Sequence, residues 1–283
     1  YNANYFNNDL MKSILSIIFT LFLFSSVNAE DISKKISEYV SNIIPGEGDT
    51  EVSIDLRENY EPDYSILAVR EISNTDNGNL FTQFSLFNAD KNNDERIIGN
   101  LGFGKRILND DKTTMTGFNA FFDYDDIGNA RSSLGLEARN ATLDFGYNYY
   151  FKIDDGTDEK VLDGYDLRLA SQIPFMHWAD LFVNNYEWEG RDRDDIKGMK
   201  IGSELLLSPT LNLELAFDDK DKDGLEDEWY ANITFVHPPR SGPSLQDGFL
   251  SDSAWKEEKD MSGELLTKVN RNNKIMVEFK GLS

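Results

Sequence analysis

The sequence has 283 residues, with 51 acidic and 28 basic side chains, a formal net charge of −23 and no cysteine. A chain this acidic repels phosphate, which argues against nucleic acid as a partner. The lack of cysteine excludes disulfides and thiolate metal sites. Divalent cations are the expected counter-ions, and no cofactor is predicted.

The first 29 residues have the pattern of a secretory signal peptide. Met11 and Lys12 are followed by an apolar run over residues 14–24 and by small residues up to Ala29, after which we expect cleavage. Residues 1–10 precede this start and are interpreted as an upstream extension. The apolar run is about half of the roughly 20 residues that a spanning helix needs, so a membrane anchor is the less favoured alternative.

Residues 30–49 are predicted to form a short periplasmic helix and a linker. Apolar residues recur at helical spacing over residues 31–44, after Asp31 as a plausible N-cap and before Pro45-Gly46.

From residue 50 to residue 236 the period of the hydrophobic pattern changes to two, as expected for strands. Twelve antiparallel strands are predicted, with bounds good to two to four residues. Their ranges are 51–57, 64–71, 80–87, 95–107, 114–123, 131–139, 141–151, 164–173, 178–188, 196–207, 211–218 and 228–236.

One face of these strands is apolar and the other is rich in Gly, Asn, Asp and Arg, which suits a crowded or wet lumen better than a surface in bulk water. We therefore predict an all-β transmembrane barrel, with a soluble β-sandwich as the alternative. The side chains expected to face lipid are Phe118, Phe122, Leu143, Phe145, Tyr147, Tyr149, Leu167, Leu213, Leu215 and Phe217. Those expected to face the lumen are Asn100, Arg106, Asn119, Asp123, Glu137, Arg139, Asp144, Asn148, Asp166 and Arg168.

The connections between the predicted strands alternate in length, apart from the first two of the short set. Outer-membrane barrels have short periplasmic turns and long outer loops. The long set is acidic, so we expect an acidic outer rim.

Charged residues on the face expected to line the lumen are predicted to pair with one another and stabilise the barrel. The alternative, more specific and less favoured, is that they line a pore and determine its ion selectivity. Large aromatic residues near strand ends are expected to form interfacial girdles. They are Phe84, Phe87, Phe118, Tyr149, Phe151, Trp229 and Phe235.

Two patterns could indicate site chemistry. Asp219, Asp221 and Asp223 before Gly224 copy the first half of a calcium loop, but the twelfth position is Tyr230 instead of Glu. A solvated hairpin is the better interpretation, and weak calcium binding stays open. His177 and His237 lie near no serine and carboxylate in a nucleophile pattern, so no enzymatic activity is expected.

Several strands also resemble the barrel domain of the inverse autotransporters, the intimin and invasin family. The motifs are NLGFGKR over residues 100–106, GFNAFFDYD over 117–125, LGLEA over 134–138, NYY over 148–150 and GYDLR over 164–168. Residues 269–280 are similar to the family segment that leaves the lumen. The resemblance implies a twelve-stranded barrel that anchors and exports a C-terminal passenger, with a linker threading the pore.

The predicted protein is thus an outer-membrane anchor or translocator, with a tail over residues 237–283 that either threads the lumen or lies exposed at the surface. The sequence ends after the linker motif, and no passenger domain is expected within it. Expected partners are outer-membrane lipids and lipopolysaccharide, the barrel-assembly machinery, and divalent cations at the acidic loops. The alternatives are a small diffusion channel, an adhesin that acts through its loops, and a soluble periplasmic β-protein.

Overall fold

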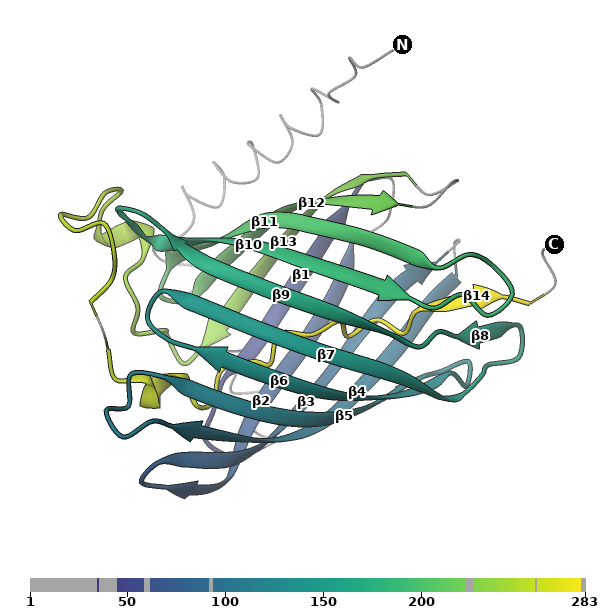
Figure 1. Ribbon diagram of the computed structural model, residues 1–283, viewed down its shortest axis with the longest axis horizontal. Helices are drawn as coiled ribbons and strands as arrows, with labels where there is room; N and C mark the ends of the chain where they lie inside the picture. Colours follow the sequence, from purple (N-terminus) through teal and green to yellow (C-terminus); the bar gives the residue numbers. More distant parts are fainter. Residues whose placement is uncertain are drawn as a thin grey trace, which may run out of the picture.

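Alternating apolar and polar residues place their side chains on opposite faces of extended strands. In the computed structural model, twelve such strands form one closed antiparallel barrel (Figure 1). The structure describes residues 35, 45–58, 62–91, 94–221, 226–257 and 259–280. The barrel strands are β1 (Thr50–Arg57), β2 (Asp63–Thr75), β3 (Gly78–Lys91), β4 (Asp94–Leu108), β5 (Met115–Asp125), β6 (Ala130–Arg139), β7 (Leu143–Asp154), β9 (Gly164–Ile173), β10 (Met176–Trp188), β11 (Ile196–Ser208), β12 (Leu211–Asp221) and β13 (Glu228–His237).

The barrel closes where the first strand pairs with the last. β1 and β13 are antiparallel from Thr50 opposite His237 to Arg57 opposite Tyr230. Every other barrel strand pairs with its neighbours in chain order, while the short β8 (Glu159–Val161) in the β7–β9 connection lies outside the ring. Closure leaves the barrel without unpaired sheet edges. The prediction of twelve antiparallel strands in a closed barrel is confirmed.

Several strands are longer than the sequence pattern indicated, because hydrogen-bonded pairing continues beyond the apolar alternation. β9 has the predicted bounds, whereas β3 starts at Gly78 and β2 extends to Thr75. The β2–β3 connection is therefore only residues 76–77, which removes one of the two exceptions to the short-turn pattern, while the β4–β5 connection still spans residues 109–114. The two longest connections, β7–β9 and β10–β11, lie at one end of the barrel, which we call the long-loop end. We call the opposite end, which carries the β2–β3, β6–β7, β9–β10 and β11–β12 turns, the short-turn end.

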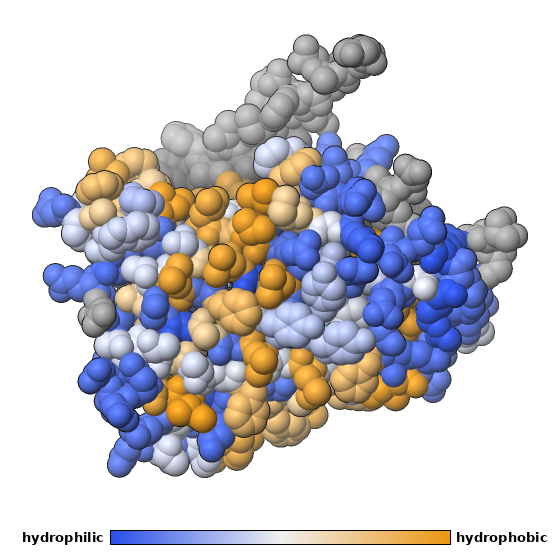
Figure 2. Space-filling model, viewed as in Figure 1, coloured by the Kyte–Doolittle hydropathy of each residue, from blue (hydrophilic) through white to orange (hydrophobic). Residues whose placement is uncertain are grey.

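The outward face of the barrel is apolar and the inward face is polar. Figure 2 shows hydrophobic residues gathered on the barrel wall and hydrophilic residues at the end that carries β8 and β14. Leu134 and Leu136 are 58% and 57% exposed, whereas Arg106 and Asp123 are fully buried. The apolar face is therefore turned away from the protein interior, as a barrel in lipid requires and a pair of stacked sheets does not.

After His237 the chain returns through the barrel. The tail forms two short 3₁₀ helices at the short-turn end, η1 (Leu245–Asp247) and η2 (Met261–Glu264). It then crosses the lumen and ends in β14 (Val277–Phe279), which pairs with β8 at the long-loop end (Figure 1). Of the two expected positions of the tail, lumenal or surface-exposed, the structure shows the lumenal one for the residues between η2 and β14.

The N-terminal predictions concern residues that the structure does not describe. The upstream extension over 1–10, the signal peptide over 11–29 and, apart from Lys35, the helix over 31–44 lie outside the described residues. Among the residues that are described, no helix has the length and apolar content needed to cross a membrane.

We predict that Leu134→Lys, in the middle of the outward face, destabilises the barrel in lipid. A Lys near the bilayer midplane on this face costs about 2–4 kcal/mol. Urea unfolding in phospholipid vesicles measures the change, and Ser241→Lys, an exposed position of the tail, adds the same charge as a control. Equal unfolding midpoints for the two variants would contradict a lipid-facing Leu134.

Candidate functional site

The inward face of β4 makes room for aromatic rings because it carries glycines. A Cβ atom on Gly102 would lie 2.2 Å from the ring of Phe121, and one on Gly104 would lie 2.4 Å from the ring of Phe81. Any larger residue at these positions would displace the rings. The glycines of the NLGFGKR segment thus fit the crowded lumen that the polar phase indicated.

The same lumen wall carries a ladder of buried ion pairs. Arg106 Nε lies 2.7 Å from Glu137 Oε1, and Arg139 bridges Glu137 at 3.0 Å and Asp144 at 3.2 Å. Further along the wall, Arg168 pairs with Glu204 at 2.7 Å. Buried charges need such partners because each unpaired charge in a low-dielectric interior costs several kcal/mol.

Asp123 lies at the centre of the wall and is shared by two arginines. Arg131 of the barrel lies 2.8 Å from its carboxylate. Arg271 of the tail makes two bonds to it, of 2.6 and 3.0 Å, and all three side chains are fully buried. The Arg271 guanidinium also lies 4.2 Å from the centre of the Phe121 ring. The tail is therefore bound to the wall by a charge-assisted, bidentate contact, which is among the stronger polar contacts in proteins.

Three basic residues of the tail, three positions apart, each reach a different carboxylate of the wall. Lys268 Nζ lies 3.1 Å from Glu51, Arg271 pairs with Asp123, and Lys274 Nζ lies 2.6 Å from Asp63. The acidic wall and the basic tail thus neutralise one another inside the lumen.

The remaining contacts are mostly from side chains of the wall to the main chain of the tail. Carbonyl oxygens of the tail accept hydrogen bonds from arginine and asparagine side chains, and the Val269 amide donates to Gln83 Oε1 at 2.8 Å. The donors and their acceptors are Asn79 and Arg106 to Leu265, Arg106 to Thr267, Arg139 to Lys268, Asn148 to Asn270, Arg131 to Asn272, and Asn100 to Asn273. The side chains of the wall therefore provide hydrogen-bond partners for backbone groups of the tail, which would otherwise be buried without partners.

At the long-loop end the tail leaves the lumen through an apolar collar. Phe87, Ile98 and Val161 pack against Ile275 and Val277 of the tail. The prediction that Phe87 belongs to an outward aromatic girdle is wrong, because β3 continues past residue 87 with that side chain on the inward phase. β14 then pairs with β8, and the Glu278 carboxylate accepts the amides of residues 191 and 192.

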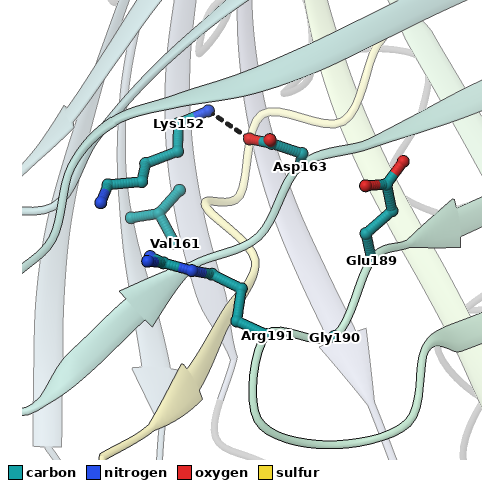
Figure 3. A pocket seen from close by; sticks show the side chains of 6 residues that line it. All are labelled: Lys152, Val161, Asp163, Glu189, Gly190 and Arg191. Carbon is teal, nitrogen blue, oxygen red and sulfur yellow. Dashed lines mark hydrogen bonds between the residues drawn. The ribbon is translucent and has the colours of Figure 1, made fainter.

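A pocket opens beside this exit, between the β7–β9 and β10–β11 connections (Figure 3). Opposite charges line it, and the amide of Lys152 donates to the Asp163 carboxylate at 2.5 Å. Its lining residues are Lys152, Val161, Asp163, Glu189, Gly190 and Arg191.

Asp155 holds the loop that carries β8. Partial burial acts to raise its pKa, but hydrogen bonds from Lys152, the Val161 amide and Arg191 lower the pKa of Asp155 to about 2. This carboxylate is therefore charged, and its bonds are kept, throughout the ordinary pH range.

The structure places most of the expected lumen residues together in the wall that contacts the tail. Asn100, Arg106, Asn119, Asp123, Glu137, Arg139, Asn148, Asp166 and Arg168 are buried, and Asp144 is partly buried. Asp166 receives hydrogen bonds from Asn148 and Tyr150.

The residues expected to face lipid lie on the outward phase, with different exposures. Exposed are Phe118, Phe122, Leu143, Phe145, Tyr149 and Leu167, while Tyr147, Leu215 and Phe217 are half-buried. Leu213 is only 2% exposed and packs with Leu207, Leu211 and Ile233, against which Leu245 of η1 also lies. At this point the tail contacts the outside of the barrel wall.

The acidic run that resembled half a calcium loop does not start as a loop. Asp219 and Asp221 belong to the end of β12, where they pair with Met199 and Lys197, and Asp223 lies outside the described residues. Within the described part of the chain, no group of three or more histidine, aspartate or glutamate residues could hold a metal ion.

Sequence reasoning did not single out several residues that hold the tail, among them Gln83, Arg131, Tyr150 and Asn79. The inward position of Arg131 and Tyr150 could have been predicted, because Arg131 lies on the same face of its strand as Glu137, and Tyr150 on the same face of its strand as Asn148. Gln83 and Asn79 carried no signal, since a neutral amide on an inward phase is equally consistent with a wet pore.

Comparisons with known proteins agree with this architecture. The family model described as the inverse autotransporter β-domain matches residues 19–273. No curated protein matches the sequence.

Solved structures are similar in fold at low sequence identity. A chain from "Unveiling the Mechanism Behind the in-meso Crystallization of Membrane Proteins" is 16% identical with a TM-score of 0.62, over 82% of this chain and 100% of that one. The outer membrane phospholipase A from Escherichia coli is 10% identical with a TM-score of 0.45, over 69% and 95%. The KdgM porin in complex with disordered oligogalacturonate is 10% identical with a TM-score of 0.43, over 66% and 98%. The likeness to the first of these structures, at 16% identity, shows the fold alone.

We predict that Arg271→Met loosens the tail and lowers stability. Removing one partner of a buried pair typically costs about 3–5 kcal/mol. Asp123 keeps Arg131 as a second partner, so the loss is expected toward the lower end of that range. Denaturant unfolding measures the loss, and planar-bilayer conductance should rise as the tail leaves the wall. Lys259→Met is the control: it removes a pair with Glu264 whose side chains remain 41% and 29% exposed, with an expected loss of about 0–1 kcal/mol. A loss no larger than that of the control would contradict the role of Arg271.

We also predict that the β8 loop opens only in strong acid. A carboxylate with a lowered pKa contributes stability above its ordinary value, and this is lost as the pH falls through the folded value, here about 2. Pepsin should spare the loop at pH values near 4 and cleave it near 2 in the native protein, but cleave Asp155→Asn throughout. The control variant Asp158→Asn, which changes an exposed aspartate of the same loop, should behave like the native protein. Resistance of Asp155→Asn to pepsin near pH 4 would contradict the prediction.

Proposed function

Because this chain belongs to the inverse autotransporter β-domain family, we propose that it exports the polypeptide attached to its C-terminal end through its own lumen. The family and the barrel fold make it an outer-membrane anchor and translocator. The observation that carries the export proposal is the path of the tail, which enters at the short-turn end and leaves between the long loops (Figure 1).

The short-turn end faces the periplasm in this proposal. Outer-membrane barrels have short periplasmic turns and longer outer loops, and both β1 and β13 join the rest of the chain at the short-turn end. A polypeptide joined to residue 283 would then emerge on the cell surface. A cleaved signal peptide over residues 11–29 and insertion by the barrel-assembly machinery complete the expected route.

The outer partners are lipids, lipopolysaccharide and divalent cations. The exposed apolar wall supports contact with acyl chains. The long loops expose carboxylates such as Asp158, Asp192 and Glu226, and hard divalent cations prefer such oxygen ligands.

We assign no enzymatic role to the barrel. The ring of His177 contacts the backbone oxygen of Ser253 at 3.0 Å, and His237 ends β13 beside Pro238. The non-enzymatic proposal rests on the family, whose barrel has a structural and transport role.

A diffusion channel is the rival function, and the position of the tail opposes it. The tail crosses the lumen and is bound by ion pairs to three buried carboxylates. Steady conductance is therefore expected for variants that release the tail, such as Arg271→Met, and not for the native chain.

An epitope tag after Ser283 tests export. We expect antibody to bind this tag on intact cells, because the tail leaves between the outer loops. The same tag inserted between Asp110 and Asp111, in the β4–β5 connection, should bind antibody only after the outer membrane is permeabilised. The reverse accessibility would refute both the orientation and the export path.

A further inference from the structure

The tail exposes an apolar surface between η1 and η2, before the segment that lies in the lumen. Phe249, Leu250 and Trp255 are 61%, 67% and 50% exposed, and Phe175 in the β9–β10 connection is 47% exposed beside them. We call residues 245–255 of the tail, together with Phe175, the rim segment. Large side chains gathered at one exposed place indicate an interaction surface more than scattered single ones do.

The rim segment is held firmly against the barrel. The Ser251 amide donates to the Phe175 carbonyl, and the Phe175 amide donates to the Ala254 carbonyl, both at 2.8 Å. Trp178 Nε1 donates to the Phe249 carbonyl at 3.0 Å, and the rings of these two residues lie 5.7 Å apart. The apolar side chains are thus exposed by an ordered framework with satisfied backbone groups, not by a loose loop.

Phe175 reaches this surface in a backbone conformation that is unfavourable for it. Its φ angle is +64°, in the left-handed region where glycine or asparagine is ordinarily found. A glycine at this turn would relieve the strain and would remove the ring. The strained position is understandable if the ring has a use where it lies.

The rim segment is continuous with the lipid-facing wall. Its first helix, η1, places Leu245 on the outward cluster of Leu207, Leu211, Leu213 and Ile233. Leu181 of β10, one strand from this cluster, is 50% exposed on the outward phase. The chain therefore contacts the outside of the wall at Leu245 and crosses the short-turn rim, because Ala254 and Lys256 already bond to the inward-facing Gln172.

From this continuity we propose that the rim segment inserts into the interface of the membrane leaflet at the short-turn end. Tryptophan and other aromatic residues are favoured at this depth, where the ring is apolar and the neighbouring groups are wet. The acids Asp247 and Asp252 are exposed along the same segment and can stay in water. The segment would then fix the tail to the leaflet before it turns into the barrel.

The lack of cysteine allows a direct measurement of depth. Single variants Leu250→Cys and Trp255→Cys, each carrying a nitroxide spin label, would be reconstituted in vesicles of phosphatidylethanolamine and phosphatidylglycerol. Accessibility to oxygen relative to a water-soluble nickel chelate reports depth. Labels at Leu134→Cys and Asp111→Cys give the values for the lipid-facing wall and for water at the short-turn end.

We expect the labels at 250 and 255 to be several-fold less accessible to the nickel chelate than the label at 111, and shallower than the label at 134. Interfacial segments lie about 5–10 Å into the boundary of headgroups and acyl chains. Values equal to those at position 111 would overturn the proposal. Spin–spin broadening that disappears on dilution with unlabelled protein would overturn it as well, by showing a second copy on the surface. Neither result depends on which way the barrel faces or on export through the lumen.

Discussion

The neutralisation of an acidic lumen by a basic tail is the interaction on which the arrangement depends. Carboxylates enclosed by a barrel wall lose most of their hydration, and an unpaired buried charge costs several kcal/mol. The barrel supplies some counter-charges itself, such as Arg131, but Asp63, Asp123 and Glu51 also receive Lys274, Arg271 and Lys268 from the tail. The folded barrel and the threaded tail are therefore parts of one electrostatic unit.

Packing around these charges explains the unusual composition of the inward face. A lumen that holds a peptide as well as arginine side chains has little space left. Glycines at positions 102 and 104 let two aromatic rings approach the wall, and the guanidinium of Arg106 lies 4.4 Å from the Phe81 ring. Small residues, aromatic rings and cations thus occur together: the glycines leave space for the rings, and the rings pack against the guanidinium groups.

Much of this organisation could be predicted from the sequence, since the period of two determines which side chains share a face. It predicted the number of strands, the closed barrel and the polar phase of Asp123, Glu137 and Arg168. The alternation could not show where strands end, because pairing extends into polar stretches such as the end of β12. It also missed the inward position of Phe87 and the partners of the tail, which depend on contacts between segments more than a hundred residues apart.

The contacts with the tail divide into two kinds with different demands on its sequence. Asn100, Arg131, Asn148 and other wall residues donate to carbonyl oxygens, which every amino acid provides, so these bonds would accept many extended sequences. The ion pairs of Lys268, Arg271 and Lys274 are specific, because a shift of the tail by one residue would move each cation away from its carboxylate. The main chain therefore gives the lumen its affinity for an extended peptide, while three basic side chains determine the register at which this peptide rests.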